Sequence, residues 1–295
     1  MTKNMFECKL TDVTQHQNTI DYLTAAGAFS DEINSNSLQG YTFKEFSLKE
    51  LGLPDYKEIL ENVIKIKNEI GLAHWRTGNT VDHSYKGFSV THNPDYFDKE
   101  VSAYHQTWGS KLLSQSYARS EGIGDHEFIK NTYYDSYSFR KVLPVVDKHL
   151  GFVLDRFSCP LIRSRVAFFN MFFKNPVDSG WHIDEIPTHL FRINIPLQTS
   201  DEYVLDIEGQ DEFGNSYSLK NKHLELGKAY VWNTRIPHRV AINKFCQNSE
   251  DRIHLVLGFS PWFDYNSEHD SFVSSKLYGI PLSTIINDKL FLKPQ

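Results

Sequence analysis

The apolar pattern of the chain changes its period near residue 160, and this change limits which folds the chain can adopt. Before it, apolar residues recur at helical spacing in two stretches, one running from Pro54 to Gly71 and the other from Pro144 to Phe157. After it, apolar and polar residues alternate, as in the segment 191–197, which is typical of half-buried strands. The pattern therefore predicts a helical first half and a strand-rich second half.

Short strands are predicted throughout the second half, with Gly, Asn and Ser turns between them. Beyond the segment 191–197 we expect strands at 202–208, 222–226, 228–233, 238–243 and 251–259. Such a succession indicates a β-sandwich or barrel. We expect one α+β domain over 1–295, with a helical and loop-rich support at 1–160, a β-core at 161–262 and a C-terminal extension at 263–295.

The composition is that of an ordinary soluble protein. The chain has 295 residues, and its 31 basic and 37 acidic side chains give a net charge of −6, so we expect neither nucleic acid nor a membrane as partner. Three widely spaced cysteines are no disulfide framework, and the N-terminus lacks the features of a signal peptide. We therefore expect a cytoplasmic protein; the pattern carries no sign of its oligomeric state.

A candidate metal site lies in the predicted β-core. His182 and Asp184 are two residues apart, so in an extended segment both side chains project from the same face. His238 follows in a later predicted strand. Two imidazoles and one carboxylate are the facial triad that holds Fe(II), and three open positions remain for a bidentate co-substrate and dioxygen.

A candidate anion anchor follows on the next predicted strand. Arg252 alternates with apolar residues, so its guanidinium is expected to face a pocket, where it can pair both oxygens of a 2-oxoacid carboxylate. His254 shares this face and is either a partner of the site or a satisfied core histidine. Arg192 and Asn194 project in the same way from the strand after Asp184. A strand interior is an unfavourable place for arginine unless an anion compensates it.

A second pair has the same spacing as the first. His223 and Glu225 also fit the pattern of a ligand pair, but their only distant follower, His269, has no arginine in the 10–14 residues after it. We therefore interpret this pair as the polar face of a strand.

The order of these motifs resembles the double-stranded β-helix (jelly-roll, cupin-like) core of Fe(II)/2-oxoglutarate-dependent oxygenases, and among them the aspartyl/asparaginyl β-hydroxylase-like group, which includes cis-proline hydroxylases. The resemblance covers about a quarter of the chain. It rests on the segments 182–184, 191–197, 226–233, 237–240 and 252–257.

The resemblance implies an iron enzyme that uses 2-oxoglutarate and O2 to hydroxylate an amino acid, a peptide residue or a related small metabolite. It implies that Arg252 binds the distal carboxylate of 2-oxoglutarate and that Arg192 assists near the metal-proximal one. The chain departs from the pattern in two ways: Asn194 stands where some relatives have histidine, and the interval from His238 to Arg252 is longer than usual. Asp184, which a halogenase of this fold would lack, favours hydroxylation.

Substrate residues are sought outside the core. The cluster His74, Trp75 and Arg76 is either a loop that grips the substrate or a turn with an anchored aromatic residue. The segment 85–96, which we expect to be an aromatic, polar loop, is a second candidate for the mouth of the site.

Two other functions remain open at this stage. The first is a non-catalytic, cupin-like protein that binds a metal or a small molecule, for which the anchoring Arg252 would be superfluous. The second is an iron-dependent isomerase, or an oxygenase that uses no 2-oxoacid.

Overall fold

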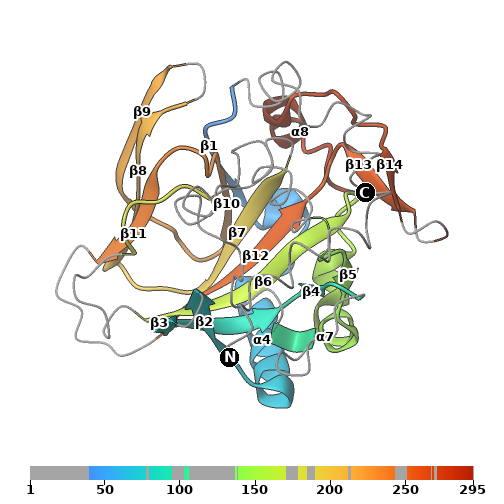
Figure 1. Ribbon diagram of the computed structural model, residues 1–295, viewed down its shortest axis with the longest axis horizontal. Helices are drawn as coiled ribbons and strands as arrows, with labels where there is room; N and C mark the ends of the chain where they lie inside the picture. The colour runs from blue at the N-terminus through green and yellow to red at the C-terminus, as the bar shows by residue number, and fades with distance from the viewer. Residues whose placement is uncertain are drawn as a thin grey trace, which may run out of the picture.

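Two antiparallel sheets form the centre of the molecule, as the computed structural model shows (Figure 1). The large sheet has the strand order β1-β10-β7-β12-β6-β3-β2, and the small sheet has the order β11-β8-β9. The structure describes residues 40–77, 80–94, 103–105, 137, 139–170, 179–184, 190–211, 214–242, 251–266, 268 and 271–294.

The strands of the large sheet come from both halves of the chain. They are β1 (Phe43–Ser47), β2 (Ala73–Thr77), β3 (Thr80–Ser89), β6 (Leu161–Phe169), β7 (Phe191–Gln198), β10 (Lys228–Trp232) and β12 (Arg252–Phe259). The small sheet contains β8 (Tyr203–Gln210), β9 (Ser216–His223) and β11 (His238–Ile242). The remaining strands form two separate pairs, β4 (Thr91–His92) with β5 (Lys141–Val142) and β13 (Phe263–Asn266) with β14 (Ser271–Ser274).

The chain passes back and forth between the two sheets. After β6 the segment 179–184 lies against β11, then β7 returns to the large sheet, and β8 and β9 form a hairpin in the small one. After the hairpin, β10 and β12 lie in the large sheet, while β11 between them belongs to the small one. This winding is that of a jelly roll, so the predicted jelly-roll core is found.

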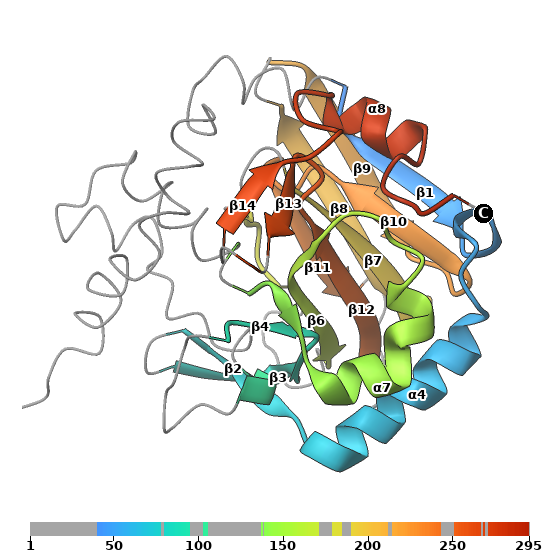
Figure 2. The ribbon, with the colours of Figure 1, turned by 90° about the vertical axis from the view of Figure 1, so that its right-hand side faces the viewer.

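Helices cover the outer face of the large sheet. Figure 2 shows α4 (Tyr56–Ile70) and α7 (Pro144–Leu154) side by side along it, at the two places where the apolar spacing predicts helices. The Asp55 carboxylate caps α4 by accepting a hydrogen bond from the Lys57 backbone N–H (2.9 Å), and Gly71, with φ of 73°, ends it. The third helix among the described residues is α8 (Leu282–Asn287).

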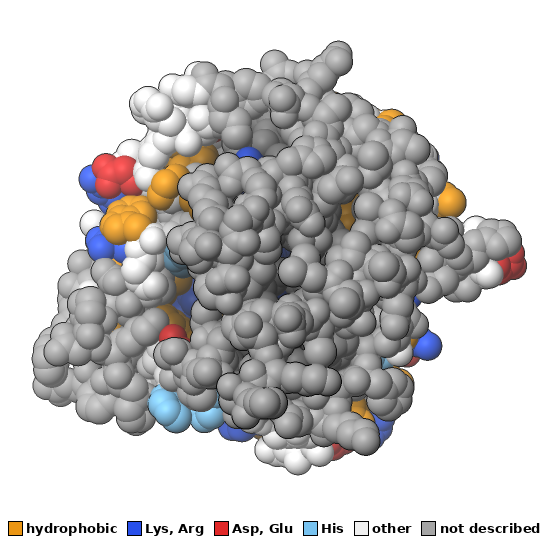
Figure 3. All heavy atoms as spheres, in the orientation of Figure 1, with side chains coloured by type: hydrophobic (Ala, Val, Ile, Leu, Met, Phe, Trp, Pro, Cys, Tyr) orange, Lys and Arg blue, Asp and Glu red, His pale blue; other side chains and the backbone are white. Residues whose placement is uncertain are grey.

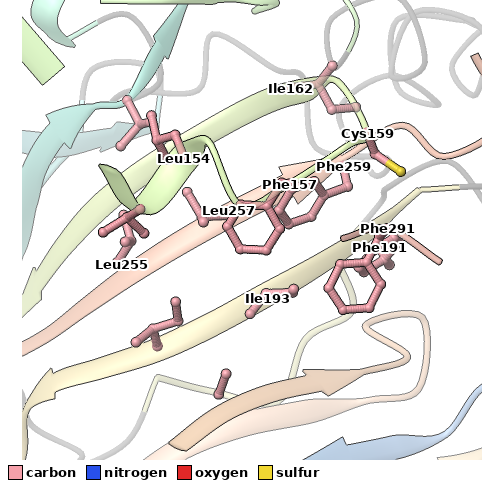
Figure 4. Packing of buried hydrophobic residues seen from close by; sticks show 14 of the residues in the cluster. Leu154, Phe157, Cys159, Ile162, Phe191, Ile193, Leu255, Leu257, Phe259 and Phe291 are labelled. Carbon is pink, nitrogen blue, oxygen red and sulfur yellow. The ribbon is translucent and has the colours of Figure 1, made fainter. Parts of the chain in front are cut away.

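The main core lies between these helices and the large sheet. In Figure 4, side chains from β7 and β12 point into one cluster with residues that follow α7. Phe259 packs against Phe157 (ring centroids 4.7 Å apart) and stacks on Phe191 (5.2 Å). The opposite faces of β7 and β12 are therefore free to carry the polar residues of a site.

The prediction for residues 1–160 was incomplete. The described part of this region contains the two helices, but it also adds β1, β2 and β3 to the large sheet. The prediction of a strand at 222–226 was wrong, because β9 spans Ser216–His223. The segment 85–96 is no single loop, since Tyr85 lies within β3 and a further strand, β4, follows it.

The surface seen in Figure 3 mixes charges of both signs. Basic and acidic side chains lie next to each other at the edge where Figure 1 places β8 and β9, and Lys220 of this hairpin pairs with Glu208 (2.9 Å). Among the described residues no helix is long and apolar enough to cross a membrane.

Candidate metal and anion site

Backbone pairing brings the three predicted metal ligands together. His182 and His238 face each other as an antiparallel pair and exchange both backbone hydrogen bonds, with N···O distances of 3.0 and 2.9 Å. The Asp184 N–H donates to the Thr234 carbonyl oxygen (2.9 Å), which keeps the segment extended as far as this residue. Side chains of directly paired residues project from one face, as do side chains two residues apart. The i, i+2 spacing therefore places all three side chains at one point.

The side-chain geometry suits a metal ion. The candidate ligand atoms of His182, Asp184 and His238 all lie within 4.8 Å of one another. The Nδ1 atoms of the two histidines lie 2.9 and 3.0 Å from the carbonyl oxygens of Gly180 and Ile236. Because a carbonyl oxygen only accepts hydrogen bonds, each Nδ1 is assigned the proton, and each Nε2 keeps its lone pair for a metal.

The electrostatics of the site keep the carboxylate ionised. Burial alone would raise the pKa of Asp184, but the positive charge of Arg192 and the neighbouring His238 and His182 hold it well below its usual value. Burial lowers the pKa of His238, so its imidazole is neutral near pH 7. Since His182 is exposed while His238 is buried, the cluster is open on one side. Two imidazoles, a carboxylate and an open side are a donor set that fits Fe(II).

Within the described ranges, this is the only group of three or more such side chains that could hold a metal ion. The competing pair does not form one. His223 lies with Nδ1 3.2 Å from the Tyr203 carbonyl oxygen, and Glu225 pairs with Lys228 (3.1 Å). The interpretation of this pair as the polar face of one strand was wrong, because β9 ends at His223 and Glu225 lies after it.

Arg252 begins β12 and lies on the face opposite the helices. Its neighbours in the strand, Ile253 and Leu255, belong to the helix-covered core. The Arg252 guanidinium Nη2 lies 3.2 Å from His254 Nδ1, and burial lowers the pKa of Arg252 to about 10. No acidic side chain among the described residues pairs with it. A partly buried cation in this situation is stabilised by a bound anion.

His254 is the partner that holds Arg252. Its side chain is 2% exposed, and burial together with the Arg252 charge lowers its pKa well below 6.5, so the ring is neutral. Because Nδ1 accepts from the guanidinium, the proton is on Nε2, which has no hydrogen-bond partner among the described atoms. His254 is therefore no satisfied core histidine, and its role as a partner of a bound 2-oxoacid's anchor stays a prediction.

Two polar residues of β7, Arg192 and Asn194, have different surroundings. Arg192 donates from Nη1 to Asp184 Oδ2 (2.5 Å), so its charge is directed at the candidate metal ligand. Asn194 is buried and lies opposite Tyr230 on one side and Val256 on the other. A role of either residue beside 2-oxoglutarate stays a prediction.

The candidate substrate residues lie in β2, so the cluster is neither a loop nor a turn, and its role in binding the substrate stays a prediction. The His74 ring contacts the His83 ring (centroids 5.0 Å apart). The Trp75 ring packs on Tyr85 (5.6 Å). Arg76 pairs with Val81 through β-ladder register, and its side chain lies outside the described part of the structure.

Sequence reasoning missed Arg165. This residue lies in β6, and its Cζ atom lies 5.4 Å from the centre of the Trp75 ring. The sequence did contain a sign of it. A strand interior is an unfavourable place for arginine, and this holds for Arg165 as it does for Arg192. A bulge in β6, where the register with β12 shifts between Val256 and Gly258, obscured the alternation.

Comparisons with known proteins give distant structural likenesses only. No protein-family model and no curated protein matches the chain. Among solved structures, the α-ketoglutarate-dependent epimerase SnoN from nogalamycin biosynthesis matches at 9% identity and a TM-score of 0.38, covering 79% of this chain and 83% of that one.

Two prolyl hydroxylases are similarly distant. The Pseudomonas putida prolyl-4-hydroxylase matches at 8% identity and a TM-score of 0.35, covering 76% and 95% of the two chains. A prolyl hydroxylase from Trichoplax adhaerens, in complex with a hypoxia inducible factor peptide, matches at 12% identity and a TM-score of 0.36. The match covers 88% of this chain and 94% of that one. TM-scores this low do not establish a shared fold, so the function has to be inferred from the site itself.

Proposed function

We propose that the protein is an Fe(II)/2-oxoglutarate-dependent dioxygenase that hydroxylates an unactivated C–H bond of an amino acid, a peptide residue or a related small metabolite. The observation that carries the proposal is the combination of two features, of which the first includes His238 on β11 of the small sheet and the second is Arg252 on β12 of the large sheet. His182, Asp184 and His238 converge on one point, and Arg252 presents a cation without an acidic partner among the described residues. A structural metal site would not require the second feature.

The reaction balances without any further reductant. With iron bound, the site would supply activation of O2, of which one oxygen atom enters succinate and the other enters the hydroxyl group, while 2-oxoglutarate loses CO2. The protein's own residues orient the partners. His182, Asp184 and His238 would hold the metal, and Arg192 keeps the carboxylate of Asp184 in place.

Arg252 would bind the distal carboxylate of 2-oxoglutarate through its guanidinium fork. His254 holds that fork from behind by accepting a hydrogen bond at Nδ1. The aromatic residues Tyr85, Phe169 and Tyr203 contact one another beside it, with centroids 5.5 and 6.4 Å apart, and would keep water from the anchored end. On the sequence motifs we further place the protein nearest the aspartyl/asparaginyl β-hydroxylase-like group.

The test is succinate formation in air with Fe(II) and 2-oxoglutarate, with and without candidate substrates. We expect His182→Ala and His238→Ala to abolish turnover and Arg252→Ala to raise the KM for 2-oxoglutarate. The matched control is His223→Ala, which removes a histidine of the competing pair and should leave turnover unchanged. Full activity in the His182→Ala protein would contradict the proposed site.

The alternative of a non-catalytic binding protein predicts a different result. Calorimetry would then show metal binding that depends on His182 and His238, but no 2-oxoglutarate binding and no succinate in any sample. Arg252 argues against this alternative, because a purely structural metal site does not need a partly buried cation without an acidic partner among the described residues.

A further inference from the structure

Residues 181–184, which we call the edge segment, extend the small sheet beyond β11. The order β11-β8-β9 makes β11 an end strand of this sheet, and β8 pairs with one side of it. The edge segment lies on the other side, where His182 and His238 exchange both backbone hydrogen bonds. Among the residues that the structure describes, no strand pairs with the outer side of the edge segment. It therefore forms an edge of the small sheet and carries two of the candidate metal ligands.

The backbone of the edge segment has open hydrogen-bonding groups. Successive residues of a paired strand turn their N–H and C=O groups to opposite sides. Those of His182 are bonded to β11, so those of Trp181 and Ile183 point away from it. Within the described part of the chain, neither of these two residues makes a backbone hydrogen bond. All three residues are exposed, so the backbone of another extended chain can reach and match these groups.

The side chains of Trp181 and Ile183 give this edge an apolar outer face. They are two residues apart in an extended segment and so share a face, and each is 45% exposed. The Arg239 guanidinium lies over the Trp181 ring (4.7 Å), and its Nε donates to Asp206 (3.0 Å). The ring is thus held in position, while much of its surface stays open to a partner. Exposed apolar side chains beside an open strand edge favour an apolar peptide as the occupant.

We propose that the edge segment binds an extended stretch of a polypeptide as an added β-strand, and that the substrate is a residue within that stretch. Side chains of residues that lie opposite each other in a sheet project from one face. The substrate residue opposite His182 would therefore direct its side chain to the side of the metal ligands. Its two neighbours would lie opposite Trp181 and Ile183 and pack on them, so we expect the oxidised residue to have an apolar residue on each side.

The inference rests on the proposed function, because it names the substrate class of the same site, but its first tests require no turnover. A display library of short random peptides is selected on the full chain without added metal. We expect the selected peptides to share one position that has an apolar residue on each side. Each peptide is then compared by calorimetry with versions that are N-methylated at single backbone amides.

Methylation should have an alternating effect. At the amides that face the edge segment it removes a hydrogen bond and places a methyl group between the strands, so it should raise the Kd at least about tenfold. At the amides between them it should leave the Kd unchanged. A peptide held by its side chains alone would not show this alternation.

Variants of the protein test the two parts of the edge. Ile183→Pro removes an N–H that points away from β11 and is compatible with an extended edge backbone. Trp181→Ser removes the apolar ring. Each should raise the peptide Kd about tenfold or more and leave the Kd of Fe(II), measured without oxygen, unchanged. The matched control is Phe152→Ser in α7, which removes a side chain of similar exposure (41%) from another surface and should leave both Kd values unchanged.

Hydrogen exchange gives a second readout of the edge. In the free protein the amides of Trp181 and Ile183 should exchange rapidly, whereas the His182 amide, which is bonded to His238, should exchange slowly. A bound peptide should slow the two rapid amides at least about tenfold. In the succinate assay a selected peptide should stimulate turnover and gain one oxygen atom on the residue between the two apolar ones, and free amino acids should not.

The inference would be overturned if no peptide were selected, if methylation had the same effect at every amide, or if Trp181→Ser left the peptide Kd unchanged. Slow exchange of the Trp181 and Ile183 amides in the free protein would also overturn it, because the edge would then already be covered. Slow exchange that depended on protein concentration would identify a second copy of the chain as the occupant. Failure of the proposed function would look different: the selected peptides would bind, but neither 2-oxoglutarate binding nor succinate formation would occur.

Discussion

Arg192 and Arg252 are two buried guanidiniums whose removal should change stability in opposite directions. Burial lowers the pKa of both to about 10. Arg192 has a carboxylate partner in Asp184, whereas Arg252 has His254, which is neutral. If the function of Arg252 is to bind an anionic ligand, its uncompensated charge lowers the free energy of unfolding of the ligand-free protein. Replacing each arginine with methionine, a residue of similar length without charge, tests this reasoning.

The magnitude follows from the pKa. The decrease in the pKa of Arg252 from its usual value to about 10 corresponds to at most roughly 3 kcal/mol of destabilisation, and partial exposure of the side chain reduces this figure. Since the folded-state pKa lies below the unfolded one, the charged form is penalised at every pH below about 10, including pH 7. Arg252→Met should therefore raise the free energy of unfolding by about 1–3 kcal/mol. Arg192→Met should lower it by about 3–5 kcal/mol, because it leaves a buried carboxylate unpaired.

The assay is urea denaturation at pH 7 of the wild type and both variants, without metal or 2-oxoglutarate and then with 2-oxoglutarate added. The wild type should gain about 2.7 kcal/mol when the ligand is present at about 100 times its Kd, and Arg252→Met should lose this gain. If Arg252→Met instead destabilised the ligand-free protein as much as Arg192→Met does, and 2-oxoglutarate did not stabilise the wild type, Arg252 would be a structural residue and the reasoning would be refuted.

Three further changes test other parts of the structure. His254→Leu removes the acceptor behind the anion anchor, so calorimetry should show about tenfold weaker 2-oxoglutarate binding with unchanged metal binding; an unchanged 2-oxoglutarate Kd would deny His254 this role. Asp55→Ala should lower the free energy of unfolding by about 1 kcal/mol in urea denaturation, because α4 loses its cap. Gly258→Ala should cost about 1–3 kcal/mol by the same measurement, since its Cβ would meet a β6 carbonyl oxygen. The control is Gly151→Ala in α7, whose Cβ would lie 3.4 Å from its nearest atom. This change should stabilise the protein, because alanine favours a helix more than glycine does. Equal effects of the two alanines would contradict the close approach of Gly258 to β6.

The parts of the fold that local periodicity determines were predictable from the sequence. The helix α4 begins at a capping Asp55 and ends at Gly71, and the alternation in β7 separates apolar residues of the core from Arg192 and Asn194. The convergence of the candidate metal ligands was also predictable. In an extended chain, side chains two residues apart project from the same face, as those of His182 and Asp184 do.

The parts that depend on distant pairing or on exposed positions were not predictable. β1 joins the large sheet by pairing with β10, where Phe43 lies opposite Trp232. The sequence of β1 alone does not indicate which strand it pairs with. β9 was displaced in the prediction because its residues are mostly polar and at least partly exposed, which leaves little apolar alternation to detect. Arg165 escaped notice because the bulge in β6 interrupts the period that would have placed it on the pocket face.

The charges around the candidate site imply an order for filling it. Three charged neighbours shift the pKa of Arg192. The carboxylate of Asp184 raises it, and the guanidiniums of Arg163 and Arg165 lower it. A divalent cation adds further positive charge to this cluster, so its binding is favoured when an anion arrives with it or before it. 2-Oxoglutarate, which carries two carboxylates, supplies that negative charge. Metal affinity should therefore rise when 2-oxoglutarate is present, and by linkage the metal should tighten 2-oxoglutarate binding by the same factor. Calorimetric titration of each in the presence and absence of the other measures both factors, and equal affinities in the two conditions would mean that the guanidiniums do not act on the metal site.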